Sequence, residues 1–99
     1  MNQPSAYDVR HESTGSDGRF VITLDTGKAA ELLYRVKGGG VWDAYRTFVP
    51  KEFEGRGLAG QLVNALVAAA HKSGVTIRPT CSYIAAWVKR HPDQADLFI

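Results

Sequence analysis

The stretch EFEGRGLAG, residues 52–60, marks the point at which the chain changes its hydrophobic period. Before this stretch apolar and polar residues alternate, as in half-buried strands, and after it apolar residues recur at helical spacing. Three glycines and an arginine lie within it. Two interpretations are open from these letters alone: a flexible turn before a helix, or a backbone cradle for the phosphates of a ligand.

The segments that precede this stretch predict antiparallel strands. Residues 19–24, 30–36 and 41–49 alternate in polarity or are rich in aromatic and β-branched side chains, and turn sequences separate them. A further extended segment over residues 7–12 is expected to pair with the first hairpin. Aromatic side chains in this half, among them Trp42, are expected to pack in the core, although one or two would also suit an acceptor groove.

The segments that follow predict a strand between two helices. A helix is expected over residues 58–73, ending at Gly74, then a strand over 75–80. Ser82 is the expected N-cap of a second helix that ends at His91, before Pro92. The predicted buried face of the first helix consists of Leu58, Leu62, Ala65, Leu66 and Ala69.

The predicted fold class is therefore α+β (mixed α/β): a mostly antiparallel sheet flanked by two helices. The connection through the helix at 58–73 is long enough to return the chain parallel to the strand at 41–49. The length of 99 residues predicts one domain over residues 1–99, with residues 1–6 expected to be flexible.

Charge and cysteine usage exclude several functional classes. The net charge is +2 and the basic residues are scattered, which argues against a nucleic-acid partner. The one cysteine, Cys81, excludes a disulfide within the chain and favours a reducing compartment. The first residues lack the apolar core of a signal peptide, and no apolar run approaches the ~20 residues of a membrane span. A cytoplasmic location without membrane contact is expected.

The glycine-rich stretch has the chemistry of an anion site. The first turn of a helix leaves backbone N–H groups unpaired, and the helix dipole attracts a phosphate. Gly55 and Gly57 would let an anion approach the backbone, and Arg56 adds a cation. Gly60 costs the helix roughly 1 kcal/mol relative to alanine, which either a close approach of ligand or tight helix packing would explain. The letters match neither a P-loop nor the context of a dinucleotide fingerprint.

Several motifs in order resemble those of a known family. EGRGLA, residues 54–59, is similar to the phosphate-binding motif Q/R-x-x-G-x-G/A of the GNAT superfamily of N-acetyltransferases, with Glu54 where Gln or Arg is usual. RTFV (46–49), GRGLA (55–59), PTCSY (79–83) and HP (91–92) together resemble the small stand-alone GNAT-like proteins. Arg46 replaces the histidine that is usual in those proteins.

The resemblance implies an acetyl-CoA site. No metal is expected, because no set of His, Cys and carboxylate residues has the spacing of metal ligands. Backbone N–H groups from Arg56 to Gly60 would hold the pyrophosphate, and the end of the strand at 41–49 would offer backbone groups to the pantetheine arm. That strand and the strand at 75–80 would splay apart and admit the thioester. The implied cofactor-binding residues are Phe48, Val49, Glu54, Gly55, Arg56, Gly57, Leu58, Ala59 and Gly60.

The implied activity is acyl-CoA-dependent N-acyl transfer, most simply of acetyl to an amine of a protein, a peptide or a small molecule. Two residues are candidates for catalysis. Cys81 would serve as a nucleophile or proton donor, or else is an inert buried thiol. Tyr83 would protonate the leaving thiolate, or else packs the first helical turn. The alternative function is a non-catalytic CoA-binding or protein-interaction module, and the expected state is a monomer or weak homodimer.

Overall fold

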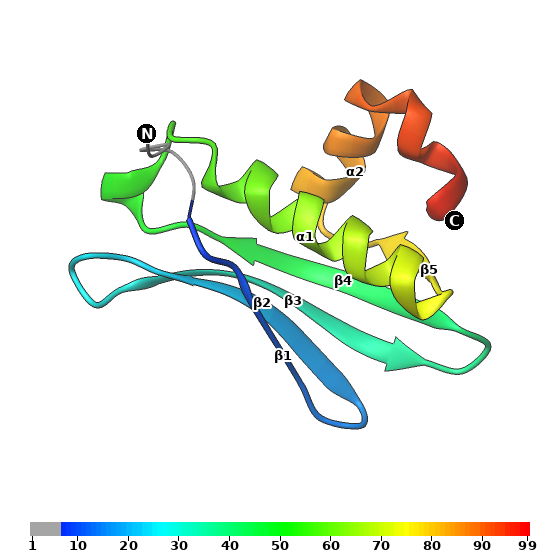
Figure 1. Cartoon of the computed structure of the whole chain (residues 1–99). Coiled ribbons are helices and arrows are strands. Elements are labelled where there is room, and N and C mark those ends of the chain that lie inside the picture. Colours follow the sequence, from blue (N-terminus) through cyan, green and yellow to red (C-terminus); the bar gives the residue numbers. More distant parts are fainter. Residues whose placement is uncertain (1–6) are drawn as a thin grey trace.

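The computed structural model describes residues 7–99, and the expectation for residues 1–6 lies outside the described residues (Figure 1). The chain forms a sheet with helices on one of its faces. The strands are β1 (Arg10–Ser13), β2 (Asp17–Thr23), β3 (Ala29–Lys37), β4 (Val41–Phe48) and β5 (Thr76–Pro79). The helices are α1 (Leu58–Ser73) and α2 (Ser82–Arg90), with 3-10 turns η1 (Lys51–Phe53) and η2 (Pro92–Leu97).

The five strands lie in the sheet in their order along the chain. Every neighbouring pair is antiparallel except β4 and β5, which α1 connects and which run parallel. The predicted α+β class, mostly antiparallel sheet and parallel last strand are therefore confirmed. The extended segment predicted at 7–12 is found as β1 at Arg10–Ser13.

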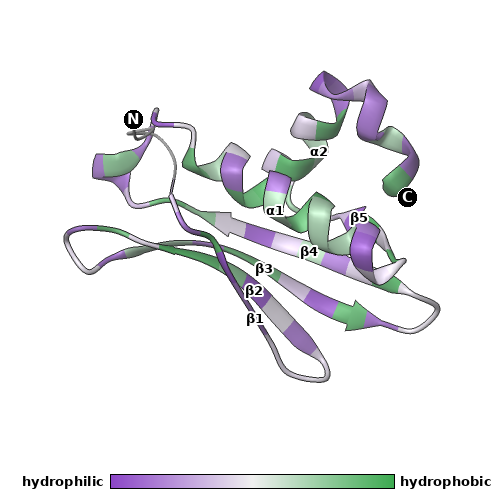
Figure 2. Ribbon diagram, in the orientation of Figure 1, coloured by the Kyte–Doolittle hydropathy of each residue, from purple (hydrophilic) through white to green (hydrophobic). Residues whose placement is uncertain are grey.

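The alternation of side chains decides which face of the sheet is buried. In β2 and β3, Phe20, Ile22, Leu32 and Tyr34 point into the core beneath the helices. On the other face Arg19 forms ion pairs with glutamates of the neighbouring strands. Both helices lie over one face of the sheet in Figure 1. Figure 2 shows apolar segments interleaved with polar ones along both helices, as helices with one buried face require.

The buried face of α1 differs in part from the predicted one. Leu58, Leu62 and Leu66 are buried as expected, but Ala65 and Ala69 lie at the edge of the core. Their places are taken by larger or better covered side chains, namely Val63, Val67 and Ala70. The helix α1 is oriented with its valines toward the sheet, because burying valine removes more apolar surface from water than burying alanine.

The start of α2 corrects another prediction. The N-cap is Cys81, with φ −66° and ψ 130°, and Ser82 is already the first helical residue. Cys81 is fixed there because its N–H donates to the carbonyl oxygen of Ala44 on β4 over 3.0 Å. At the other end His91 caps the helix and stacks on Trp87, with ring centroids 3.9 Å apart. The contact with β4 thus overrides the local preference for serine as N-cap.

The parallel pairing of β4 with β5 is short. It begins at Val41 with Thr76 and ends at Ala44 with Pro79. β4 then continues to Phe48, whereas the chain after β5 turns into α2. Beyond Ala44 the two segments therefore separate, which leaves a gap in the sheet next to the N-terminal ends of both helices.

Candidate functional site

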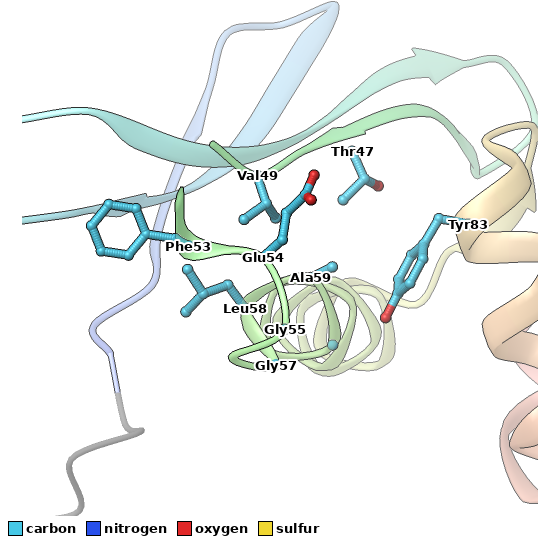
Figure 3. Close-up of a pocket in the computed structure, with 10 residues that line it drawn as sticks. Thr47, Val49, Phe53, Glu54, Gly55, Gly57, Leu58, Ala59 and Tyr83 are labelled. Carbon is cyan, nitrogen blue, oxygen red and sulfur yellow. The ribbon is translucent and has the colours of Figure 1, made fainter. Parts of the chain in front are cut away.

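A pocket of about 390 Å³ lies where β4 ends and where α1 and α2 begin. Figure 3 shows it with the end of the sheet on one side and α1, viewed along its axis, on the other. Its floor and walls come from three separate segments of the chain. The lining residues are Thr47, Val49, Phe53, Glu54, Gly55, Gly57, Leu58, Ala59, Gly60 and Tyr83.

The glycine-rich loop forms one wall through its backbone. Gly55 and Gly57 have φ angles of +83° and +79°, a left-handed conformation that favours glycine. Gly57 is the N-cap of α1, and within residues 7–99 no side chain caps this helix or places an acidic group in its first turn. A β-carbon at either glycine would find no atom within 4 Å. The same glycines therefore make the turn and leave the space beside the backbone open.

The N-terminus of α1 presents backbone donors to the pocket. The first helical hydrogen bond runs from the N–H of Gln61 to the carbonyl oxygen of Gly57, at 3.1 Å. The N–H groups of Leu58, Ala59 and Gly60 precede it and cannot bond within the helix. The helix dipole adds a partial positive charge at this end. Because these residues line the pocket, an anion bound there would meet several donors and a favourable field.

Gly60 faces the pocket rather than a close-packed neighbour. A β-carbon there would lie 3.9 Å from the Tyr83 hydroxyl oxygen, which is ordinary van der Waals contact. Tight helix packing therefore does not require glycine at this position. The backbone of the first turn of α1 is therefore open toward the pocket at Gly60.

Glu54 is the one charged side chain among the residues that line the pocket. In Figure 3 its carboxylate extends from the loop toward the end of β4, where Val49 and Thr47 lie. Arg56 does not line the pocket, since its guanidinium lies over the ring of Phe53, 4.9 Å from the ring centroid. In this arrangement the charge of Arg56 is outside the pocket and the charge of Glu54 is inside it.

Three residues predicted for the site do not line the pocket: Phe48, Arg56 and Cys81. The Phe48 side chain is 43% exposed and pairs with Glu31, on the sheet face away from the helices. Its neighbour Val49 does line the pocket. Alternation along β4 explains the difference, because successive side chains point to opposite faces.

Two residues line the pocket that the sequence did not indicate, Phe53 and Thr47. Phe53 is a buried residue of η1 and closes one end of the pocket, opposite Tyr83 in Figure 3. Thr47 reaches the pocket through an irregularity in β4. Ala44 of β4 pairs with Tyr34 of β3, and the preceding residue of β3, Leu33, pairs with Arg46 instead of Tyr45. Tyr45 is therefore an extra residue in β4. A β-bulge of this kind leaves no clear signal in a single sequence.

The Cys81 thiol lies just behind the pocket wall. Its Sγ donates a hydrogen bond to Oγ1 of Thr47 over 3.5 Å. Burial raises the pKa of Cys81, but the hydrogen bond with Thr47 and backbone hydrogen bonds from Ile84 and Tyr83 outweigh it, so that the pKa is lowered. The thiol itself does not line the pocket, but it contacts two residues that do, Thr47 and Tyr83.

Tyr83 occupies the wall formed by the first turn of α2. Figure 3 shows its hydroxyl directed toward the first turn of α1, beside the glycine-rich loop. Of the two catalytic candidates it is the one that lines the pocket. A phenol in this place can donate a hydrogen bond to a bound ligand.

Within residues 7–99 no cluster of three or more His, Cys, Asp or Glu side chains is arranged to hold a metal ion. Neither α1 nor α2 combines the length and hydropathy needed to cross a bilayer.

Comparison with known proteins places this fold and loop in a family context. A family profile described as GCN5-related N-acetyl-transferase matches residues 19–97. The chain is 36% identical over 93 residues to Protein NATD1 of Xenopus tropicalis, covering 93% of this chain and 84% of that protein. Protein NATD1 of Mus musculus is 35% identical over 94 residues, covering 90% and 86%.

A solved structure is also similar. The solution NMR structure of a GCN5-like protein from Staphylococcus aureus superposes with a TM-score of 0.70 and 21% identity, covering 91% of this chain and 87% of that one. This likeness concerns the arrangement of the sheet and helices.

Proposed function

The chain belongs to the GCN5-related N-acetyltransferase family, and from that premise we propose that it is an acyl-CoA-dependent N-acyltransferase. The proposed reaction transfers acetyl from acetyl-CoA to an amine of a protein, a peptide or a small molecule. The observation that carries the proposal is the open glycine cradle at the uncapped N-terminus of α1, which forms part of the pocket next to the gap between β4 and β5.

The residues present fit the phosphates of such a ligand. The N–H groups of Leu58, Ala59 and Gly60 would bind the pyrophosphate, with the left-handed glycines allowing it to approach the backbone. The pantetheine arm would follow the end of β4 past Val49, where β4 has lost β5 as a neighbour. Acetyl-CoA supplies an activated thioester as co-substrate. Phe48 would contribute through its backbone alone, since its side chain faces away.

Transfer of acetyl to an amine needs a neutral amine nucleophile and a proton donor for the departing thiolate. The Tyr83 hydroxyl lines the pocket and would donate that proton directly. Cys81 is the other candidate. It does not line the pocket, but its thiol is hydrogen-bonded to Thr47, which does. A backbone N–H in the gap beside β4 would stabilise the developing oxyanion.

Titration calorimetry with acetyl-CoA tests the site, and a thiol-release assay against a panel of amines tests the reaction. Absence of detectable acetyl-CoA binding would overturn the proposal. Turnover that survives Cys81→Ala but not Tyr83→Phe would assign the proton donor to Tyr83, and the reverse result would assign it to Cys81. Cys81→Ala should bind acetyl-CoA as the wild type does, because Cys81 does not line the pocket.

A non-catalytic CoA-binding module is the second candidate function. One observation favours it: Arg46 stands where histidine is usual in the small GNAT-like proteins, and an arginine, which stays protonated, cannot act as a base there. Acetyl-CoA binding without thiol release on any amine would support this candidate over the enzyme.

A further inference from the structure

We propose that Thr47 has two roles: it positions the Cys81 sulfur behind the pocket wall, and as a catalytic residue it relays the proton of Cys81 into the pocket. The part of this inference that concerns the departing thiolate rests on the proposed function. The part that concerns the Cys81 sulfur stands on the geometry of β4 and α2.

The β-bulge in β4 places Thr47 on the helix side of the sheet. Paired residues of an antiparallel sheet share a face, and Ala44 and its partner Tyr34 both point to the helix side. Regular alternation from Ala44 would turn residue 47 to the opposite face. The extra residue, Tyr45, shifts the register so that Thr47 pairs with Leu32, which is completely buried on the helix side. Thr47 thereby lies on the helix side of the sheet and lines the pocket.

Thr47 is also the contact between the pocket and the cysteine. Thr47 lines the pocket, and its Oγ1 accepts a hydrogen bond from the Cys81 Sγ at 3.5 Å. The backbone of Cys81 is held to β4 as well, because its N–H donates to the Ala44 carbonyl over 3.0 Å. Both the backbone and the sulfur of Cys81 are thus held against β4, at Ala44 and at Thr47.

The direction of the hydrogen bond suits a relay. The Cys81 S–H donates to Thr47 Oγ1, which leaves the Thr47 O–H able to donate into the pocket. When the thioester breaks, the CoA sulfur takes the Thr47 proton and forms an S–H bond. At the same time Oγ1 takes the proton of Cys81, whose S–H bond breaks to leave a thiolate. The nitrogen of the acceptor amine loses a proton to solvent as the amide forms, and solvent returns one proton to the Cys81 thiolate, so that no atom or charge is left over.

Other titratable groups lie around this contact. Asp43 of β4 accepts a hydrogen bond from Thr80, Tyr83 follows in α2, and Glu54 enters the pocket from the loop. The lowered pKa of Cys81 has burial and hydrogen bonds as its causes, with no contribution from the charge of any of these groups. Thr47 is the largest of the causes that lower it.

The first test needs no turnover. Because Cys81 is the one cysteine of the chain, the rate of alkylation by iodoacetamide reports on it alone. Thr47→Val keeps the shape of the side chain and removes the hydroxyl, whereas Thr47→Ser keeps the hydroxyl. The expected midpoint of the rate against pH is the same in wild type and Thr47→Ser, and higher by about half a pH unit or more in Thr47→Val. Circular dichroism establishes that each variant is folded.

A midpoint in Thr47→Val equal to that of the wild type would overturn the positioning role. The second test is the pH profile of kcat/KM for acetyl transfer. We expect the wild type and Thr47→Ser to lose activity at high pH as Cys81 titrates, and Thr47→Val to be slower by about tenfold and to lack that limb. An unchanged limb in Thr47→Val would overturn the relay. If no amine supports turnover in the wild type, the proposed enzyme fails and the relay with it, while alkylation still decides the positioning role.

Discussion

The ring of Tyr34 occupies the space that a side chain on Gly18 would need. A β-carbon added at Gly18 would overlap with Cζ and the hydroxyl oxygen of Tyr34. Gly18 pairs directly with Tyr34 across β2 and β3, and the Tyr34 ring is fixed by stacking on Trp42 at a centroid distance of 4.4 Å. A buried ring held on several sides cannot move away at low cost.

We therefore expect Gly18→Ala to lower the free energy of unfolding by about 2–3 kcal/mol, the upper range for overpacking of a core. The measurement is the midpoint of urea unfolding. Gly15→Ala is the matched control, since nothing lies within 4 Å of the position where its β-carbon would be. An equal effect of the two substitutions would contradict the role assigned to Tyr34.

His11 makes stability depend on pH. Its Nε2 lies 2.6 Å from the Tyr34 hydroxyl, and its ring stacks on Phe20 at 4.2 Å. Burial lowers the pKa of His11 below the usual 6.5, so the unfolded chain binds a proton more readily than the folded one. The free energy of unfolding is therefore higher above about pH 6.5, and this contribution is lost as the pH falls through the lower pKa that His11 has in the folded state.

The melting temperature should accordingly decrease from about pH 7 to about pH 5. The exposed carboxylates Glu12 and Glu52 have lowered pKa values because hydrogen bonds from Arg19 and Lys28 favour their charged form, so they stay ionised in this window. His11→Phe removes the titrating group and keeps a flat ring, and its melting temperature should vary less with pH. A variant as sensitive to pH as the wild type would assign the effect to other groups.

Gly57→Glu should abolish acetyl-CoA binding, with an affinity loss of at least about 100-fold. The new carboxylate would enter the cradle and repel the pyrophosphate, and the left-handed backbone at φ +79° would be strained. Titration calorimetry measures the loss. Gly39→Glu is the control for strain, since Gly39 has φ +78° and open surroundings in the turn between β3 and β4. Loss of binding in both variants would mean that strain, and not the cradle, is responsible.

Glu54→Gln should bind acetyl-CoA more tightly than the wild type, by about threefold to tenfold at low salt. The substitution removes the one negative charge from the pocket wall and leaves an amide of the same size. Glu52→Gln is the matched control: it removes the same charge two residues away, where the carboxylate pairs with Lys28 outside the pocket. Weaker binding of Glu54→Gln would show that the carboxylate contacts the ligand favourably.

Much of the fold follows from local sequence patterns. Alternation of polarity predicts the strands, helical spacing predicts α1, and glycines at 55 and 57 mark the loop, because each of these signals reflects the conformation of a few neighbouring residues. The resemblance of ordered motifs added the family, which the comparisons confirm at the level of the domain. Eight of the predicted site residues line the pocket for the same reason: most of them belong to one continuous loop and helix turn.

The sequence by itself therefore determined the order of strands and helices, the family and the place of the glycine cradle. Only the tertiary structure decided which side chains line the pocket and which distant residues come into contact. The extra residue at Tyr45 turns Thr47 into the pocket, pairing with β4 makes Cys81 the N-cap in place of Ser82, and two strands bring His11 against Tyr34. Each of these contacts joins residues far apart in the chain, where strand register and packing, and not the preferences of neighbouring residues, determine position.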